Sequence, residues 1–151
     1  MPLDTTTLVL LHKVREKLNS SESFRNAVKG WSSRILVKIN PPDPRAPYSY
    51  RVLMEVRDGV CTALRVLEPE EQVAADVQVE MDIGTYEAML KGETSSTAAF
   101  LSGKLRIRGK TMELLRRKAA LEVLNETMRE MLFGGGAIPA MLPYLRREFT
   151  F

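Results

Sequence analysis

Three neighbouring stretches decide the fold: ADVQVEMD at residues 75–82, YEAMLKGE at 86–93 and AAFLSGKLRIRG at 98–109. In the first stretch Val77, Val79 and Met81 alternate with polar residues. This period of two is typical of a strand that buries one face. The third stretch predicts a similar strand over 104–108, with its apolar residues inward and its three basic residues outward.

Helices are expected between and after these two strands. Gly92 and Gly103 mark the ends of short helices over 85–91 and about 96–101, because glycine favours the conformation that terminates a helix. Thr111 is placed to cap a long last helix that continues to about residue 133. The apolar stripe of that helix comprises Leu114, Leu121, Leu124, Met128 and Met131, widened by Met112, Leu115, Ala119 and Val123.

The sequence before residue 75 predicts two helices and then three strands. Apolar residues keep helical spacing over about 5–18, and a short second helix ends at Gly30. Alternation then predicts strands over 35–40, 48–57 and 60–66 that form an antiparallel meander, with a proline-rich loop at 40–47 and a hairpin turn at Asp58-Gly59. In the third strand, one face would carry Val60, Thr62, Leu64 and Val66, and the other Cys61 and Ala63.

This order of elements predicts the class α+β, with a single five-stranded antiparallel sheet covered by helices on one face. At 151 residues the chain has the length of one domain, 1–151, with a core over about 21–133 and an apolar C-terminal tail over 134–151. The expected domain is long enough to bury a core without a disulfide or a metal.

Composition excludes several kinds of chemistry. With one cysteine, Cys61, the chain has no intramolecular disulfide and no cysteine-rich zinc site, and with one histidine, His12, it has no multi-histidine metal centre. We expect Cys61 to be a buried, inert thiol and His12 to lie at the surface or at a helix cap. No pair of base and nucleophile is evident, so the sequence predicts no enzyme, no catalytic residue, no metal and no cofactor.

The basic residues are concentrated in one segment. Residues 104–118 carry seven lysines and arginines against Glu113, a net charge of +6, which leaves −3 for the rest of a chain whose total is +3. Such a patch is typical of a surface that meets an anionic partner, although a solvated strand and helix face explains it equally well. We do not expect a nucleic-acid partner.

The sequence shows neither a signal peptide nor a transmembrane helix. The start, MPLD, lacks basic residues, and the apolar run at 8–11 is short. The uncharged stretch at 131–145 is interrupted by three glycines and two prolines. The expected protein is soluble and cytoplasmic.

Apolar residues exceed what one sheet face needs. The stripe of the last helix is wide, and the tail adds Ile138, Met141, Leu142 and Leu145 at helical offsets. Methionine adapts to irregular space and to variable apolar ligands. The surplus therefore indicates either a hollow core that holds a lipid or a filled core in which methionine serves packing.

The quoted stretches resemble the sterol carrier protein family, also called non-specific lipid-transfer or SCP-2-like domains. The resemblance rests on an Ala-Asp strand, a short helix ending in Lys-Gly, an Ala-Phe turn and the strand GKLRIRG at 103–109. Gly30-Trp31, Asp58-Gly59 and the order of elements over about 24–132 support it. It implies a sheet and helices that enclose an apolar tunnel for a fatty acyl chain, an acyl-CoA, a sterol or an isoprenoid, without covalent catalysis.

The resemblance also implies a set of site residues. Those expected to line the tunnel are Met89, Leu90, Phe100, Leu101, Ser102, Met112 and Leu115. Arg106, Arg108 and Lys110 are expected to meet an anionic head group or a membrane surface. Ser102 stands where animal carriers often have glutamine, which changes the polar contact available to a sterol.

Two functions follow. The first is a lipid-binding or lipid-transfer domain with a lipid or acyl-CoA ligand and transient membrane contact. The alternative is a non-catalytic interaction or dimerisation module of the same fold, acting as a homodimer or scaffold in a lipid or quinone pathway. Truncation at Gly134 would weaken lipid binding in the first case and change the oligomer mass in the second.

Overall fold

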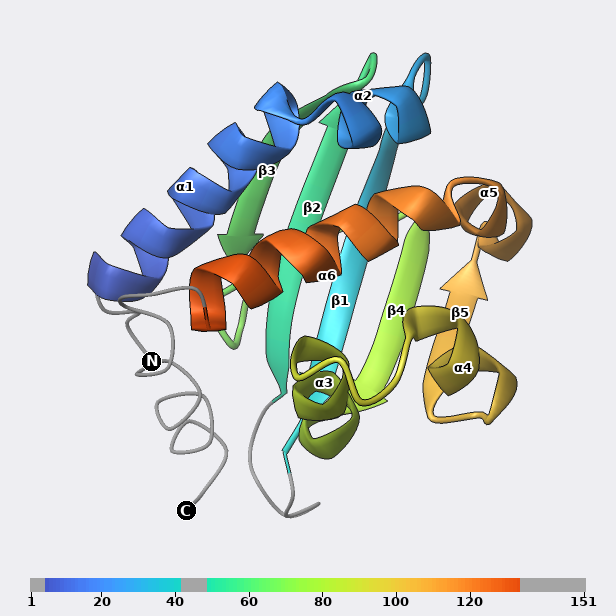
Figure 1. Ribbon diagram of the computed structural model, residues 1–151. Helices are drawn as coiled ribbons and strands as arrows, with labels where there is room; N and C mark the ends of the chain where they lie inside the picture. Colours follow the sequence, from blue (N-terminus) through green and yellow to red (C-terminus); the bar gives the residue numbers. More distant parts are fainter. Residues whose placement is uncertain (1–4, 42–48, 134–151) are drawn as a thin grey trace.

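The computed structural model describes residues 5–41 and 49–133 (Figure 1). Its helices are α1 (Thr5–Ser20), α2 (Glu22–Val28), α3 (Ile83–Leu90), α4 (Ser96–Leu101), α5 (Thr111–Arg116) and α6 (Lys118–Phe133). Its strands are β1 (Ser33–Asn40), β2 (Tyr50–Arg57), β3 (Val60–Val66), β4 (Val77–Asp82) and β5 (Leu105–Gly109). These elements confirm the predicted α+β class. The C-terminal tail and most of the proline-rich loop lie outside the described residues.

The strands form one sheet in the order β3-β2-β1-β4-β5. The predicted meander is confirmed, and the tight turn between β2 and β3 holds Asp58 at φ 50° and Gly59 at φ 76°, as a two-residue hairpin requires. The prediction of a fully antiparallel sheet is wrong at one pair, because β4 lies parallel to β1. A parallel neighbour needs a connection that returns along the length of the sheet.

That connection, residues 67–76, crosses the side of the sheet away from the helices. Leu67 and Val73 pack there on Leu36 and Leu53 in a small second core. Arg51 holds the segment by donating hydrogen bonds to the carbonyls of residues 68 and 69, at 2.7 and 3.2 Å. Because the connection returns along the sheet in this way, β4 lies beside β1 and parallel to it.

The other side of the sheet carries the main core and is covered by helices, with α6 crossing it diagonally (Figure 1). Ile35, Val37 and Ile39 of β1 face this core, as the alternation predicts. In β3 the predicted face is partly wrong: Cys61 and Leu64 are both buried, whereas Thr62 is exposed. The register shifts between Glu55 and Val56, which leaves one extra residue in β3 and changes which side chains point inward.

The last helix is interrupted, contrary to the prediction of one helix over 111–133. Arg117 leaves helical geometry at φ −111° and ψ 23°, so that α5 and α6 are separate. Its guanidinium donates to the carbonyls of Ala27 and Lys29 at the end of α2 and lies 5.8 Å from the Trp31 ring centre. Lys110, not Thr111, precedes α5 as its cap residue, and it makes no side-chain capping bond.

Candidate functional site

An apolar cavity lies between the helix-covered face of the sheet and α6. All five strands contribute to it, together with α1, α3, α4 and α6. Its lining comprises Leu11, Val37, Ile39, Val52, Leu64, Val79, Met81, Tyr86, Met89, Ser96, Leu105, Leu121, Leu124, Asn125 and Met128. The cavity has a volume of about 70 Å³. The cavity is therefore apolar and narrow.

Three polar side chains interrupt this lining: Tyr86 on α3, Ser96 on α4 and Asn125 on α6. Burial raises the pKa of Tyr86 to about 12, so the phenol is neutral at physiological pH. Ser96 is buried and Asn125 is half-buried. Within residues 5–41 and 49–133, neither side chain has a hydrogen-bond partner.

A more polar depression, which we call the mouth, adjoins the cavity between α6 and the segment that joins α3 to α4. Its lining comprises Met89, Gly92, Thr94, Ser95, Ser96, Glu122, Asn125, Glu126 and Arg129. It shares Met89, Ser96 and Asn125 with the cavity. The Arg129 guanidinium lies over Gly92, where an added Cβ would approach it to 2.9 Å.

Of the seven side chains expected to line a tunnel, Met89 alone is among those that line the cavity. Leu90 is fully buried in the core, and Phe100 and Leu115 are half-buried. Three of the seven side chains are exposed. They are Leu101, which is 78% exposed, Met112, which is 65% exposed, and Ser102, whose hydroxyl donates to the Ala99 carbonyl at 3.1 Å.

The physical reason is the orientation of two short helices. α4 contributes to the cavity through Ser96 at its N-terminal end, while its C-terminal residue Leu101 points to solvent. The break at Arg117 separates α5 from α6, and it is α6 that lies over the cavity. The helical periodicity of the sequence predicts that Leu121, Leu124 and Met128 share one stripe, and it carries no signal for Asn125 within that stripe.

The basic residues of β5 lie on the opposite side of the sheet from the cavity. Leu105 lines the cavity, so the alternate residues Arg106 and Arg108 project from the other face. Arg106 pairs with Glu80 at 3.4 Å, and Lys110, just beyond β5, pairs with Asp76 at 3.6 Å. Arg106 and Arg108 therefore do not point into the cavity, and the expectation that these basic residues meet an anionic head group or a membrane surface stays a prediction.

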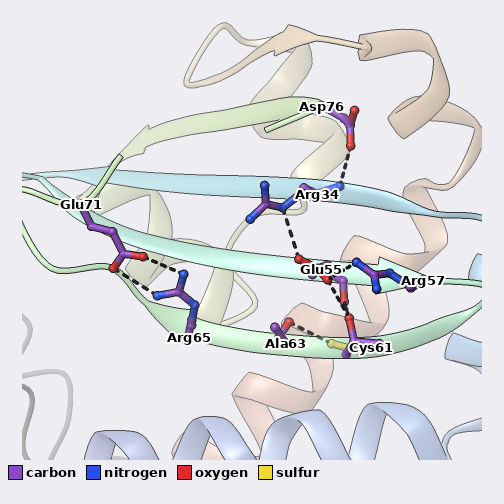
Figure 2. Close-up of polar contacts among 9 residues, drawn as sticks. Arg34, Glu55, Arg57, Cys61, Ala63, Arg65, Glu71 and Asp76 are labelled. Carbon is purple, nitrogen blue, oxygen red and sulfur yellow. Dashed lines mark hydrogen bonds and ion pairs between the residues drawn. The ribbon is translucent and has the colours of Figure 1, made fainter. Parts of the chain in front are cut away.

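We call this side of the sheet the open face. Figure 2 shows Glu55 between Arg34 and Arg57, each with a nitrogen 3.2 Å from a carboxylate oxygen. Arg65 binds Glu71 there at 2.7 Å, and this hydrogen bond lowers the pKa of the Glu71 carboxyl. The open face is thus a charged surface with several ion pairs.

The single cysteine and the single histidine lie where the sequence predicts. Cys61 is 1% exposed, and burial raises its pKa to about 11, which keeps the thiol protonated at physiological pH. His12 lies exposed on α1, within 3.1 Å of Glu16. In the described part of the chain, no group of three or more histidine, cysteine or acidic side chains is arranged to hold a metal ion. Among the helices of these residues, none has the length and apolar character needed to span a membrane.

Comparison with known proteins identifies the family. The model of the SCP-2 sterol transfer family matches residues 11–122, and the chain belongs to this family. The membership supports lipid binding or transfer at a general level. No curated protein gives a significant match.

Solved structures show the same fold. A crystal structure of sterol carrier protein 2 has 25% identity and a TM-score of 0.70, covering 84% of this chain and 98% of that chain. The solution structure of a conserved hypothetical protein from Thermus thermophilus has 25% identity and a TM-score of 0.69, covering 86% of this chain and 91% of that one. The solution structure of palmitated SCP2L2 from Aedes aegypti has 12% identity and a TM-score of 0.54, and the match covers 80% of this chain and 95% of that chain.

Proposed function

We propose that the chain is a non-catalytic lipid carrier that holds the apolar part of one lipid in the cavity beneath α6. The observation that carries this proposal is a lining of apolar side chains from all five strands and from three helices, α1, α3 and α6. Each buried methylene group of a ligand contributes about 0.8 kcal/mol, so such a lining favours an alkyl or isoprenoid chain. Family membership points to the same ligand class.

The cavity must widen when a lipid enters. Its volume of about 70 Å³ is below the roughly 300–1,000 Å³ of ordinary small-molecule pockets. Three of the lining residues, Met81, Met89 and Met128, are unbranched and adapt readily to a new shape. The apolar lining residues of α6, Leu121, Leu124 and Met128, are half-buried, so these side chains have room to move aside.

Native mass spectrometry of the purified full chain tests this proposal. We expect a stoichiometric lipid adduct, either carried from the expression host or formed with an added long-chain lipid. Leu121→Trp should abolish the adduct, because its indole would fill the cavity. Val123→Trp is the matched control, because Val123 is half-buried on the same helix but lies outside the lining. An adduct that survives Leu121→Trp in a folded protein would contradict this site.

The narrowness of the cavity also favours the alternative function, an interaction or dimerisation module with a filled core. The same spectrum distinguishes the two. A ligand-free mass that persists with added acyl-CoA and isoprenoids, together with a dimer peak, would support the module.

Delivery to and from membranes would use the open face. Arg108 is exposed and has no partner among the described residues, and Arg106 and Lys110 lie near it at the sheet edge. Basic residues close to an anionic membrane each contribute about 1 kcal/mol of attraction. On this proposal the basic segment binds the membrane surface while the cavity on the other side holds the lipid.

A further inference from the structure

The polar groups of the cavity gather at its junction with the mouth. Ser96 and Asn125 come from α4 and α6 and line both spaces. Within the described residues these two side chains have no hydrogen-bond partner, and neither residue contributes a polar atom that is both fully buried and unpaired, so their polar atoms remain accessible to a ligand. A serine hydroxyl and a carboxamide both donate and accept hydrogen bonds. Together they form a place for a polar group at the end of an apolar ligand.

The charges around this junction do not favour an anion. The cavity lining holds no lysine, arginine, aspartate or glutamate among the described residues. The mouth carries Glu122 and Glu126 against Arg129, a net negative charge. The basic residues of β5 lie on the open face and cannot reach it. An anionic head group placed here would lose water and meet two carboxylates against the single guanidinium of Arg129, which is costly.

We propose that the cavity and its mouth select lipids with an uncharged hydroxyl or carbonyl head group over lipids that end in a carboxylate. The inference rests on the proposed function, since it assumes that the alkyl part of the ligand occupies the cavity. Ser96 and Asn125 would hydrogen-bond the head group, and Glu122 and Glu126 would repel an anion.

The test compares two ligands that differ only in their head group: a saturated fatty alcohol and the fatty acid of the same chain length. Their affinities for the full chain are measured at neutral pH by displacement of a fluorescent lipid, with native mass spectrometry as a second readout. We expect the alcohol to bind several times more tightly than the acid. The comparison removes the contribution of the alkyl chain, which is common to both.

Variants assign the selectivity to named side chains. Asn125→Leu removes the carboxamide and raises helix propensity, so the protein should remain folded. It should weaken alcohol binding about twofold to tenfold, the effect of one lost hydrogen bond. Glu122→Gln combined with Glu126→Gln should strengthen binding of the acid by up to about fivefold, as expected for exposed charges. Glu22→Gln combined with Glu70→Gln is the control for the same change of net charge, because both side chains are exposed and neither lines the cavity or the mouth.

The outcomes separate this inference from the proposed function. If the acid binds as tightly as the alcohol or more tightly, the inference is overturned while the proposal of a lipid carrier stands. A loss of acid binding in Arg129→Gln would then identify Arg129 as the group that binds the carboxylate. Unchanged alcohol affinity in Asn125→Leu would also overturn the inference. If neither ligand binds and no adduct is seen, the proposed function fails and the inference falls with it.

Discussion

At the scale of a single residue, Gly109 explains why the strand GKLRIRG ends in glycine. Its φ is +91°, a conformation that L-residues with side chains rarely adopt. An added Cβ would contact the carbonyl oxygen of Asp76 and approach the Cα of Val77 to 3.2 Å. The same carbonyl accepts a hydrogen bond from the Lys110 amide at 2.9 Å. Gly109 therefore allows the backbones of β4 and β5 to approach closely.

We expect Gly109→Ala to lower the free energy of unfolding by at least about 1 kcal/mol more than Gly103→Ala does. Both substitutions place alanine at a positive φ, which costs about 1–2 kcal/mol. Gly103 has a φ of +78° but open space around its Cβ position, so it isolates the conformational cost from the clash. Urea unfolding followed by circular dichroism measures both values. Equal losses would show that the contact with Asp76 is relieved without cost.

At the scale of the elements, Arg117 links the start of α6 to the end of α2. Its guanidinium donates to two carbonyls at 3.3 and 3.0 Å and lies over Trp31. Cations stabilise the carbonyl end of a helix, and an arginine over an indole adds attraction. This side chain therefore holds the break between α5 and α6 in place.

Arg117→Ala should lower the free energy of unfolding by about 1–3 kcal/mol, because two hydrogen bonds and the indole contact are lost. Arg116→Ala is the matched control, since Arg116 is exposed, adjacent in sequence and without a partner in the described part of the chain. Fluorescence of Trp31, the single tryptophan, reports the unfolding and also the local change. The same loss in both variants would argue against a specific role for Arg117.

The elements also show what the sequence can predict. Alternation and turn residues identify each strand and the hairpin at Asp58-Gly59, because both are local. The parallel pairing of β1 with β4 is not local: it depends on where residues 67–76 pack. The break at Arg117 was missed because it depends on contacts with α2, about ninety residues earlier.

The candidate site was predicted only in part for a similar reason. Apolar periodicity placed Leu121, Leu124 and Met128 on one face of a helix, and these residues do line the cavity. Apolar periodicity alone does not distinguish these lining residues from Met112 and Leu115, which lie on α5, because the break at Arg117 that separates α5 from α6 leaves no mark in the periodicity. Asn125 gave no signal, since a polar residue in an apolar stripe is informative only when its surroundings are known.

At the scale of the whole molecule, the sheet separates two kinds of surface. The apolar cavity lies on the helix-covered side, and the basic residues of β5 lie on the open face. A carrier that binds the membrane through the open face would keep the α6 side, with the mouth, away from the lipid head groups. Release of the lipid from the cavity into the membrane would then require the molecule to reorient or the lipid to cross the β5 edge of the sheet. For this reason the affinity for the membrane and the rate of lipid transfer can change independently.

We therefore expect the double variant Arg106→Gln/Arg108→Gln to bind anionic vesicles more weakly, by about 1 kcal/mol for each residue removed. Lys13→Gln/Arg25→Gln makes the same change of net charge on the exposed surfaces of α1 and α2, and should have a smaller effect. Vesicle co-sedimentation at two salt concentrations measures the affinity of both double variants, since the attraction should weaken as salt shortens the Debye length.

If the two double variants lose the same affinity, net charge alone governs the contact. If neither loses affinity, the open face does not bind membranes, and the ion pairs of Arg106 and Lys110 serve only to hold β5 against β4.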